Sequence, residues 1–110
     1  MPTAVPDAIT RYFEVDARRD NNAIVALFTD DAVVVDEGKT RHGVDDIRAW
    51  REGPASRYQY TTEVLDCEST GDGAYVVTGR LRGNFPGGTV DLKWRFTLDG
   101  NRIAYLHIAP

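Results

Sequence analysis

The apolar residues in the first quarter of the chain recur at helical spacing, which predicts two helices. Pro6 and Asp7 suit a first helical turn, because proline lacks an N–H that would be unpaired there and a carboxylate favours the positive end of the helix dipole. Asp20 is a good N-cap for the second helix. The predicted buried stripes are Ile9, Tyr12, Phe13, Asp16 and Ala17, then Ala23, Ile24, Leu27 and Phe28.

A short strand pair and a third helix are predicted next. The β-branched run 32–36 indicates a strand, residues 37–39 indicate a turn, and residues 40–42 return beside the first strand. The sequence Gly53-Pro54 ends the third helix. The apolar positions of that helix are Val44, Ile47 and Trp50.

The second half of the chain alternates between apolar and polar residues with period two, which is typical of strands. Turns are predicted at Asp72-Gly73, at residues 86–88 and at residues 99–101. The predicted inward faces are Tyr58, Tyr60, Thr62 and Val64; Tyr75, Val77, Gly79 and Leu81; Val90, Leu92, Trp94 and Phe96; and Ala104, Leu106 and Ile108. The last strand then directs Tyr105 and His107 to the outer face.

These elements predict a single α+β domain over residues 1–110, in which three helices pack on one face of a strongly curved antiparallel sheet. Gly79 and Gly83 lie within one predicted strand, where glycine often marks a bend or bulge. A bent sheet covered by helices encloses a cone-shaped cavity. We therefore expect one pocket for a small molecule.

The order of elements resembles the NTF2-like superfamily, and within it the SnoaL-like and ketosteroid-isomerase-like branch. The resemblance is carried by Ala23-Ile24-Val25-Ala26-Leu27-Phe28-Thr29-Asp30-Asp31-Ala32-Val33-Val34-Val35-Asp36 and by Gly43-Val44-Asp45-Asp46-Ile47-Arg48-Ala49-Trp50. It covers nearly the whole chain and implies the cone-shaped NTF2-like fold. The fold alone does not define the activity, because it hosts unrelated functions.

The resemblance also implies site residues. Ketosteroid isomerases use an Asp base and an oxyanion hole made of a Tyr and a protonated Asp. Position by position, the base corresponds to Asp36 and the tyrosine to Tyr12, whereas the second acid corresponds to Leu92. Asp91 cannot replace that acid, because a one-residue slip would turn the inward residues of its strand outward.

Each candidate also has a purely structural interpretation. Asp36 precedes Glu37-Gly38-Lys39 and could simply hold the first position of a turn, whereas in an apolar cavity its pKa would rise toward the range of a general base. Tyr12 could bind a ligand oxygen or serve as core, and Asp16 reads as a helix-face or capping group. The predicted pocket wall is Phe28, Val34, Trp50, Tyr60, Val77, Leu92, Trp94 and Leu106.

The composition of the chain narrows the range of possible binding partners. The net charge of −4, with basic and acidic residues interleaved, argues against a nucleic acid or an anionic membrane surface. No secretory signal is expected at the N-terminus, and no apolar run is long enough to span a bilayer. The single cysteine, Cys67, is expected to be inert. We therefore expect a cytoplasmic protein. His42 and His107 lack metal-ligand spacing, so neither a metal nor another cofactor is expected.

Three hypotheses for function follow. The chain could be a cofactor-independent isomerase, cyclase or dehydratase, in which Asp36 removes a proton next to a carbonyl and Tyr12 stabilises the oxyanion. It could instead bind a small apolar or aromatic metabolite without turnover, or be an interaction domain whose cavity is packed core. The outer sheet face, with Ile103, Tyr105 and Thr78 among charges, suits a homodimer, as the resemblance also implies.

Overall fold

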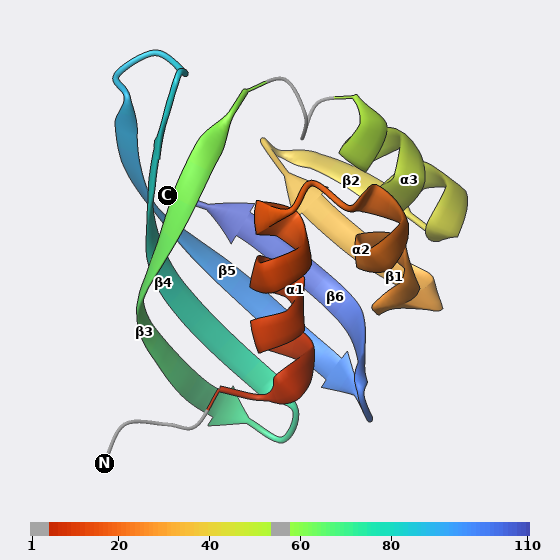
Figure 1. Ribbon diagram of the computed structural model, residues 1–110. Coiled ribbons are helices and arrows are strands. Elements are labelled where there is room, and N and C mark those ends of the chain that lie inside the picture. Colours follow the sequence, from red (N-terminus) through yellow and green to blue (C-terminus); the bar gives the residue numbers. More distant parts are fainter. Residues whose placement is uncertain (1–4, 54–57) are drawn as a thin grey trace.

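The computed structural model describes residues 5–53 and 58–110, and within them three helices pack on one six-stranded curved sheet (Figure 1). The elements are α1 (Asp7–Ala17), α2 (Asn21–Ala26), β1 (Phe28–Asp36), β2 (Lys39–His42), α3 (Val44–Glu52), β3 (Tyr60–Gly71), β4 (Ala74–Gly83), β5 (Thr89–Asp99) and β6 (Arg102–Ala109). The α+β class is therefore confirmed. The third helix does not precede the sheet, because β1 and β2 come before it.

The strands are ordered β2-β1-β6-β5-β4-β3 across the sheet. A hairpin joins β1 to β2, and further hairpins join β3 to β4, β4 to β5 and β5 to β6. Each of these four pairs is antiparallel. The pair β1 and β6 is parallel, with Val34 opposite Leu106, and the prediction of a wholly antiparallel sheet is wrong at this junction. A parallel pair needs a long connection, and here everything between Asp36 and Arg102 supplies it.

The helices cover the concave face of the sheet. Helix α1 runs across this face between the β3–β4 side and the β1–β2 side, while α2 and α3 lie together over β1 (Figure 1). Strand β3 forms one edge of the sheet, and its Val64, which lies beside Ile9 and Phe13 of α1, is 42% exposed. The covered part of the sheet, beneath the three helices, is where the core forms.

Local chemistry explains where the helices begin. Asp20 caps α2 as predicted, accepting a hydrogen bond from the Ala23 backbone N–H at 3.1 Å. Helix α3 begins after Gly43, whose φ of 86° few other residues tolerate. Asp46 in its first turn accepts a hydrogen bond from the His42 backbone N–H at 3.2 Å, so a carboxylate binds a free donor at the positive end of the helix. Gly53 ends α3 as predicted, and Pro54 lies outside the described residues.

Phe28 corrects the prediction for the second helix. The stripe placed it on α2, but α2 ends at Ala26 and Phe28 begins β1. Phe28 pairs with Ile103 of β6, and the Ile103 N–H donates to the Leu27 carbonyl at 2.8 Å. Pairing with a distant strand therefore overrides the local helical spacing.

The last strand corrects a second prediction. Its register against β5 shifts between Thr97 and Leu98, so that Thr97 pairs with Tyr105 and Leu98 with Ile103. The extra residue, Ala104, is a β-bulge, which resets the alternation. Ile103 is therefore fully buried on the inner face instead of lying on the outer face, and the inward series is Ile103, Leu106 and Ile108. The outer face keeps Tyr105, and a dimer through it stays a prediction.

Strand β5 confirms its predicted alternation. Trp94 and Phe96 are buried, while the residues between and beside them, Lys93, Arg95 and Thr97, are exposed. On the neighbouring strand β4, Val77 and Gly79 are buried, as predicted. Among the described residues no helix is both long and apolar enough to cross a membrane.

Gly79 leaves room for the Trp94 ring. A Cβ at this position would lie 2.8 Å from Trp94 Cζ3 and 3.0 Å from the Glu63 carbonyl oxygen. We expect Gly79→Ala to lower the free energy of unfolding by about 1–3 kcal/mol, because the tryptophan must move from its rotamer. Gly71→Ala is the matched control in the same sheet, since a Cβ there meets nothing within 4 Å. Urea denaturation of both variants measures the difference, and equal losses would refute the explanation.

Candidate functional site

A cavity of about 580 Å³ opens between the helices and the concave face of the sheet. Its apolar wall comes from β4 and β5, with Leu81, Val90, Leu92 and Trp94. Tyr58 and Phe85, whose ring centroids lie 6.1 Å apart edge to face, also line it. The remaining side chains on the wall include polar groups from α1, β1, α3 and β3: Tyr12, Asp16, Asp36, Trp50, Arg51 and Tyr60.

The predicted wall residues divide into two groups. Trp50, Tyr60, Leu92 and Trp94 line the cavity. Phe28, Val34, Val77 and Leu106 do not line it; they lie within the packed core and are at most 2% exposed. Aromatic packing fills that part of the cone: the Tyr12 ring lies edge to face against Phe28 and Phe96, at centroid distances of 6.5 and 5.5 Å.

Asp36 lines the cavity and also flanks the hairpin turn, so both interpretations of it apply. It pairs with Lys39 across Glu37 and Gly38, which have φ of 54° and 74°, as expected for a tight turn with positive φ at both central residues. The Trp50 indole Nε1–H donates to Asp36 Oδ2 at 2.9 Å. Burial raises the pKa of this carboxyl, and the bond from Trp50 partly opposes the rise.

Tyr12 reaches the same cavity from α1 and is 2% exposed. None of the hydrogen bonds among the described residues uses its hydroxyl. Burial, followed by the nearby Asp16 carboxylate, raises the pKa of Tyr12 well above its usual value. The hydroxyl therefore stays protonated and can donate to a ligand oxygen.

A buried ion pair stands beside these two residues. Arg51 Nη2 lies 2.7 Å from Asp16 Oδ1, and the two residues are 1% and 5% exposed. The Tyr60 hydroxyl donates to the same carboxylate, at 3.0 Å from Oδ1 and 3.2 Å from Oδ2. Burial and the Asp16 charge raise the pKa of Tyr60 to about 12, which keeps it a donor.

This cluster corrects the interpretation of Asp16 as a helix-face or capping group, and the sequence pattern did not indicate Arg51 as a site residue. One signal was present: Asp16 is four residues after Tyr12, on the face of the helix that is buried. Arg51 directly follows the buried Trp50, but nothing local indicates that a second charge turns inward. Only the meeting of α1, α3 and β3 reveals the pair.

Arg19 holds β3 against the end of α1. Its Nη2 donates to the Tyr58 carbonyl at 2.8 Å, and its Cζ lies 4.3 Å from the Tyr60 ring centroid. Arg19 itself has a φ of 58°, an uncommon conformation for a residue with a side chain. Tyr60 is therefore held from both sides, by Arg19 on its ring and by Asp16 at its hydroxyl.

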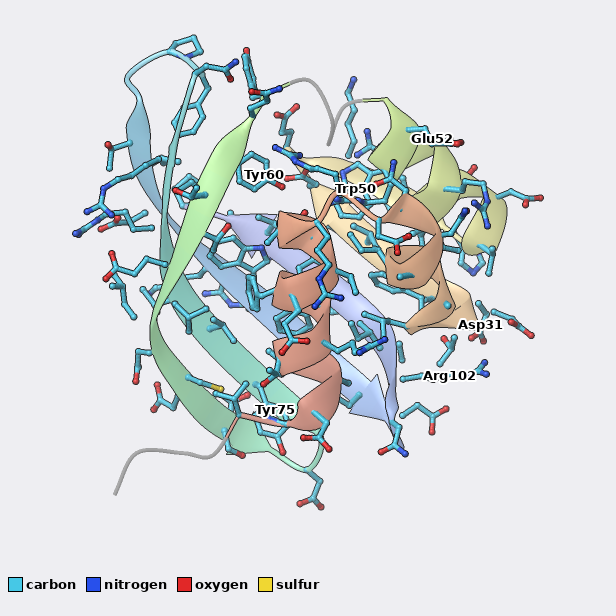
Figure 2. All side chains as sticks on the ribbon, viewed as in Figure 1. Asp31, Trp50, Glu52, Tyr60, Tyr75 and Arg102 are labelled. Atoms are coloured by element: carbon cyan, nitrogen blue, oxygen red, sulfur yellow. The ribbon has the colours of Figure 1, made fainter. Side chains whose placement is uncertain are left out.

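Figure 2 shows how these side chains are grouped. Trp50 and Tyr60 lie toward the same end of the molecule, one on α3 and the other at the start of β3, whereas Tyr75 lies at the opposite end. The polar groups therefore gather at one end of the concave face.

His107 is half-buried and lines the cavity together with Ile108, Ala109 and Pro110. Side chains of a strand alternate between faces, so four consecutive lining residues indicate that the end of β6 presents its main chain to the cavity. Because Leu106 and Ile108 lie on the inner face, this lining agrees with the predicted outward direction of the His107 side chain.

Burial raises the pKa of the Cys67 thiol, which disfavours the reactive thiolate. Among residues 5–53 and 58–110, no three His, Cys, Asp or Glu side chains gather in a way that could hold a metal ion.

The arrangement is suited to proton transfer. Asp16 forms an ion pair with Arg51 and accepts a hydrogen bond from Tyr60, whereas the Asp36 carboxylate lies at the cavity wall. Tyr12 adds a protonated hydroxyl in the same apolar space. A carboxylate and a separate protonated donor at the wall of one largely apolar cavity are the groups that proton transfer next to a carbonyl uses.

Comparisons with known proteins agree with this picture. The model of a family described as the SnoaL-like domain matches residues 9–106. A proposed polyketide cyclase from Sinorhizobium meliloti is 35% identical in sequence, and the structural match covers 96% of this chain and 95% of that one with a TM-score of 0.88. None of the curated proteins compared with the chain matches it.

More distant structures share the fold alone. A Catenulispora acidiphila protein with a ketosteroid isomerase-like fold, solved with trimethylamine, is 18% identical over 97% of this chain and 87% of that one, with a TM-score of 0.85. The Mycobacterium tuberculosis protein Rv0760c, solved with estradiol-17β-hemisuccinate, is 15% identical over 94% of this chain and 90% of that one, with a TM-score of 0.78.

The ion pair makes a prediction about stability. Asp16→Asn removes the carboxylate from the buried Arg51 and should lower the free energy of unfolding by about 3–5 kcal/mol. The double variant Asp16→Leu/Arg51→Met buries no charge at these positions and should recover much of the loss. Chemical denaturation tests both. Asp91→Asn, which breaks the exposed pair with Arg80, is the control and should change little; an equal loss there would contradict the role of burial.

Proposed function

Because the chain belongs to the SnoaL-like domain family, as the match over residues 9–106 shows, we propose that it is a cofactor-independent enzyme of the isomerase, cyclase or dehydratase type. Asp36 is the general base and Tyr12 the oxyanion donor. The observation that carries the proposal is the Asp36 carboxylate at the wall of an apolar cavity, with its pKa raised by burial.

The proposed step balances without a cofactor. Asp36 takes a proton from the carbon next to a carbonyl, and the C–H electron pair becomes the C=C bond of an enolate. The negative charge on the carbonyl oxygen is stabilised by the Tyr12 hydroxyl. Return of the proton to another carbon is isomerisation, attack of the enolate carbon on an electrophile closes a ring, and loss of a β-hydroxyl as water is dehydration.

Burial gives Asp36 the basicity that this step needs. An ordinary aspartate is a weak base, and a pKa closer to the working pH makes it a stronger one that is still ionised. Withdrawal from water raises the Asp36 pKa in this way, while the Trp50 N–H keeps the carboxylate in place. Asp16 is less suited to act as the base, because its carboxylate is already paired with Arg51 and hydrogen-bonded by Tyr60.

Leu92 limits which substrates can react. It lines the cavity where the resemblance places a second oxyanion acid, and it offers no donor. Losing one such donor typically costs about 10²–10³ in rate. The proposed substrates are therefore carbon acids that ionise more easily than a steroid ketone.

The substrate class follows from the cavity wall and from the relatives. We propose a small apolar or aromatic metabolite, since Trp94, Leu92 and Tyr58 give the wall an apolar and aromatic character. The proposed cyclase from S. meliloti and the steroid derivative held by Rv0760c are consistent with ring-containing ligands.

A second candidate is a binding module that holds such a metabolite without turnover. The buried Asp16–Arg51 pair favours it, because a rigid polar wall also suits recognition alone. Turnover separates the two: binding without exchange of any substrate proton supports the module, and Asp36-dependent exchange supports the enzyme.

The enzyme hypothesis predicts the loss of proton exchange on removal of the base. Small enolisable ketones and polyketide-like aromatics are incubated with the protein in D₂O, and α-deuteration is followed by NMR. Asp36→Asn should lower the rate by about 10²–10⁴, and Tyr12→Phe by about 10²–10³. Asp30→Asn, an exposed change on the same strand, should keep the wild-type rate. Full exchange in Asp36→Asn would exclude this base.

The raised pKa predicts a pH dependence of both rate and stability. The rate should rise with pH through the Asp36 pKa and then level, because only the carboxylate accepts a proton. A carboxyl whose pKa is higher when folded contributes stability below the unfolded pKa, near 3.8, and this is lost as pH rises through the folded pKa. Asp36→Asn should therefore gain stability over wild type across that interval. Thermal unfolding between pH 3 and 7 measures it, and a constant difference would contradict the shift.

A further inference from the structure

We infer that Trp50 is the positioning residue of this site: its indole N–H holds the Asp36 carboxylate in the orientation that serves proton transfer. The inference rests on the proposed function of Asp36 and adds a residue that works through it. The geometry behind it is the 2.9 Å bond from Trp50 Nε1 to Asp36 Oδ2, between residues fourteen apart in the chain.

The donor is rigid because its own side chain is locked. Trp50 is 2% exposed on α3, and this helix packs on β1 and β2. The Arg51 guanidinium carbon lies 5.3 Å from the centroid of the indole ring, and Arg51 is itself tied to Asp16. A ring that cannot turn keeps its N–H aimed at one carboxylate oxygen.

The Asp36 carboxylate, which accepts this hydrogen bond, needs a partner that fixes its orientation. Asp36 is the last residue of β1, next to a tight turn, and its side chain is only half-buried. A carboxylate there could rotate toward solvent, which would take the base away from a ligand in the cavity. A misplacement of about 1 Å at a reacting group can cost about 10²-fold in rate. The indole N–H is the only side-chain donor to this carboxylate among the hydrogen bonds of the described residues.

The bond from Trp50 also affects the pKa of Asp36, together with the burial of the carboxyl and several neighbouring groups. Burial raises its pKa and Glu37 adds to the rise, while the Trp50 N–H, Arg41 and the Glu37 backbone N–H lower it. Among the described residues, the other titratable or charged side chains around it are Lys39 on β2, Tyr12 and Asp16 on α1, Arg51 on α3, Tyr60 on β3 and His107 on β6. Replacing Trp50 by Phe removes the indole donor and keeps all of these side chains.

The test compares two tryptophan variants. Trp50→Phe keeps an aromatic ring but removes the donor, so the Asp36 pKa should rise by about one unit or more, since a hydrogen bond to a charged group is worth about 1.5–3 kcal/mol. Trp94→Phe is the matched control: Trp94 lines the same cavity without bonding Asp36, and its loss should leave that pKa in place. Carboxyl ¹³C titration of Asp36 measures both. An unchanged pKa in Trp50→Phe, or an equal rise in Trp94→Phe, overturns the inference.

A second measurement uses the wild-type chain, in case Trp50→Phe does not fold. The chain has two tryptophans, so its ¹H–¹⁵N spectrum has two indole signals, and the Trp94→Phe spectrum assigns them. The Trp50 indole signal should titrate with the Asp36 pKa, and the titration should vanish in Asp36→Asn. A Trp50 signal that ignores the protonation of Asp36 refutes the bond in solution.

These results separate the inference from the proposed function. If the indole signal and the carboxyl pKa respond as expected but Asp36→Asn keeps full proton exchange, Trp50 holds a carboxylate that is not the base, and the positioning role fails together with the proposed function. If Asp36→Asn loses exchange while Trp50→Phe keeps both the wild-type rate and the acid limb of its pH profile, the base stands and the positioning role is refuted. Support requires a lower exchange rate and an acid limb moved to higher pH in Trp50→Phe.

Discussion

The buried ion pair between Asp16 and Arg51 is the interaction on which the cavity depends. Two charges taken out of water are costly, and only close pairing with further hydrogen bonds offsets the cost. The pair meets this condition with an N–O distance of 2.7 Å and a hydrogen bond from Tyr60. The pair joins α1 to α3, and Tyr60 adds β3, so satisfying the charges fixes three elements around one end of the cavity.

The position of the proposed base follows from this pair. Arg51 lies over the ring of Trp50, and the Trp50 indole donates to Asp36, so a continuous series of contacts leads from the charge pair to the carboxylate of the proposed base. Two aspartates in one cavity thereby acquire different roles. Asp16 is bound to a cation, whereas Asp36 is withdrawn from water with one indole donor, and this withdrawal raises the pKa of Asp36.

The local pattern predicted much of this molecule. Strict alternation in β5 placed Trp94 and Leu92 on the inner face, and Asp20 marked the start of α2. It failed where a distant strand intervened. Phe28 left its helical spacing to pair with Ile103, and a bulge at Ala104 moved Ile103 inward. Half of the predicted wall, Phe28, Val34, Val77 and Leu106, lies in the packed core instead, where the Tyr12 ring contacts Phe28.

The sequence by itself determined the class of fold and the inner and outer faces of β5, because periodicity and turn chemistry act between near neighbours. The choice of Asp36 and Tyr12 as the proposed base and donor came from the family resemblance, and both line the cavity. Tertiary structure alone decided the parallel pairing of β1 with β6, the inward turn of Arg51 toward Asp16, and the bond from Trp50 to Asp36. These join residues 14 to more than 60 positions apart. Their energy comes from burial that exists only after the helices close over the sheet, so no local pattern records it.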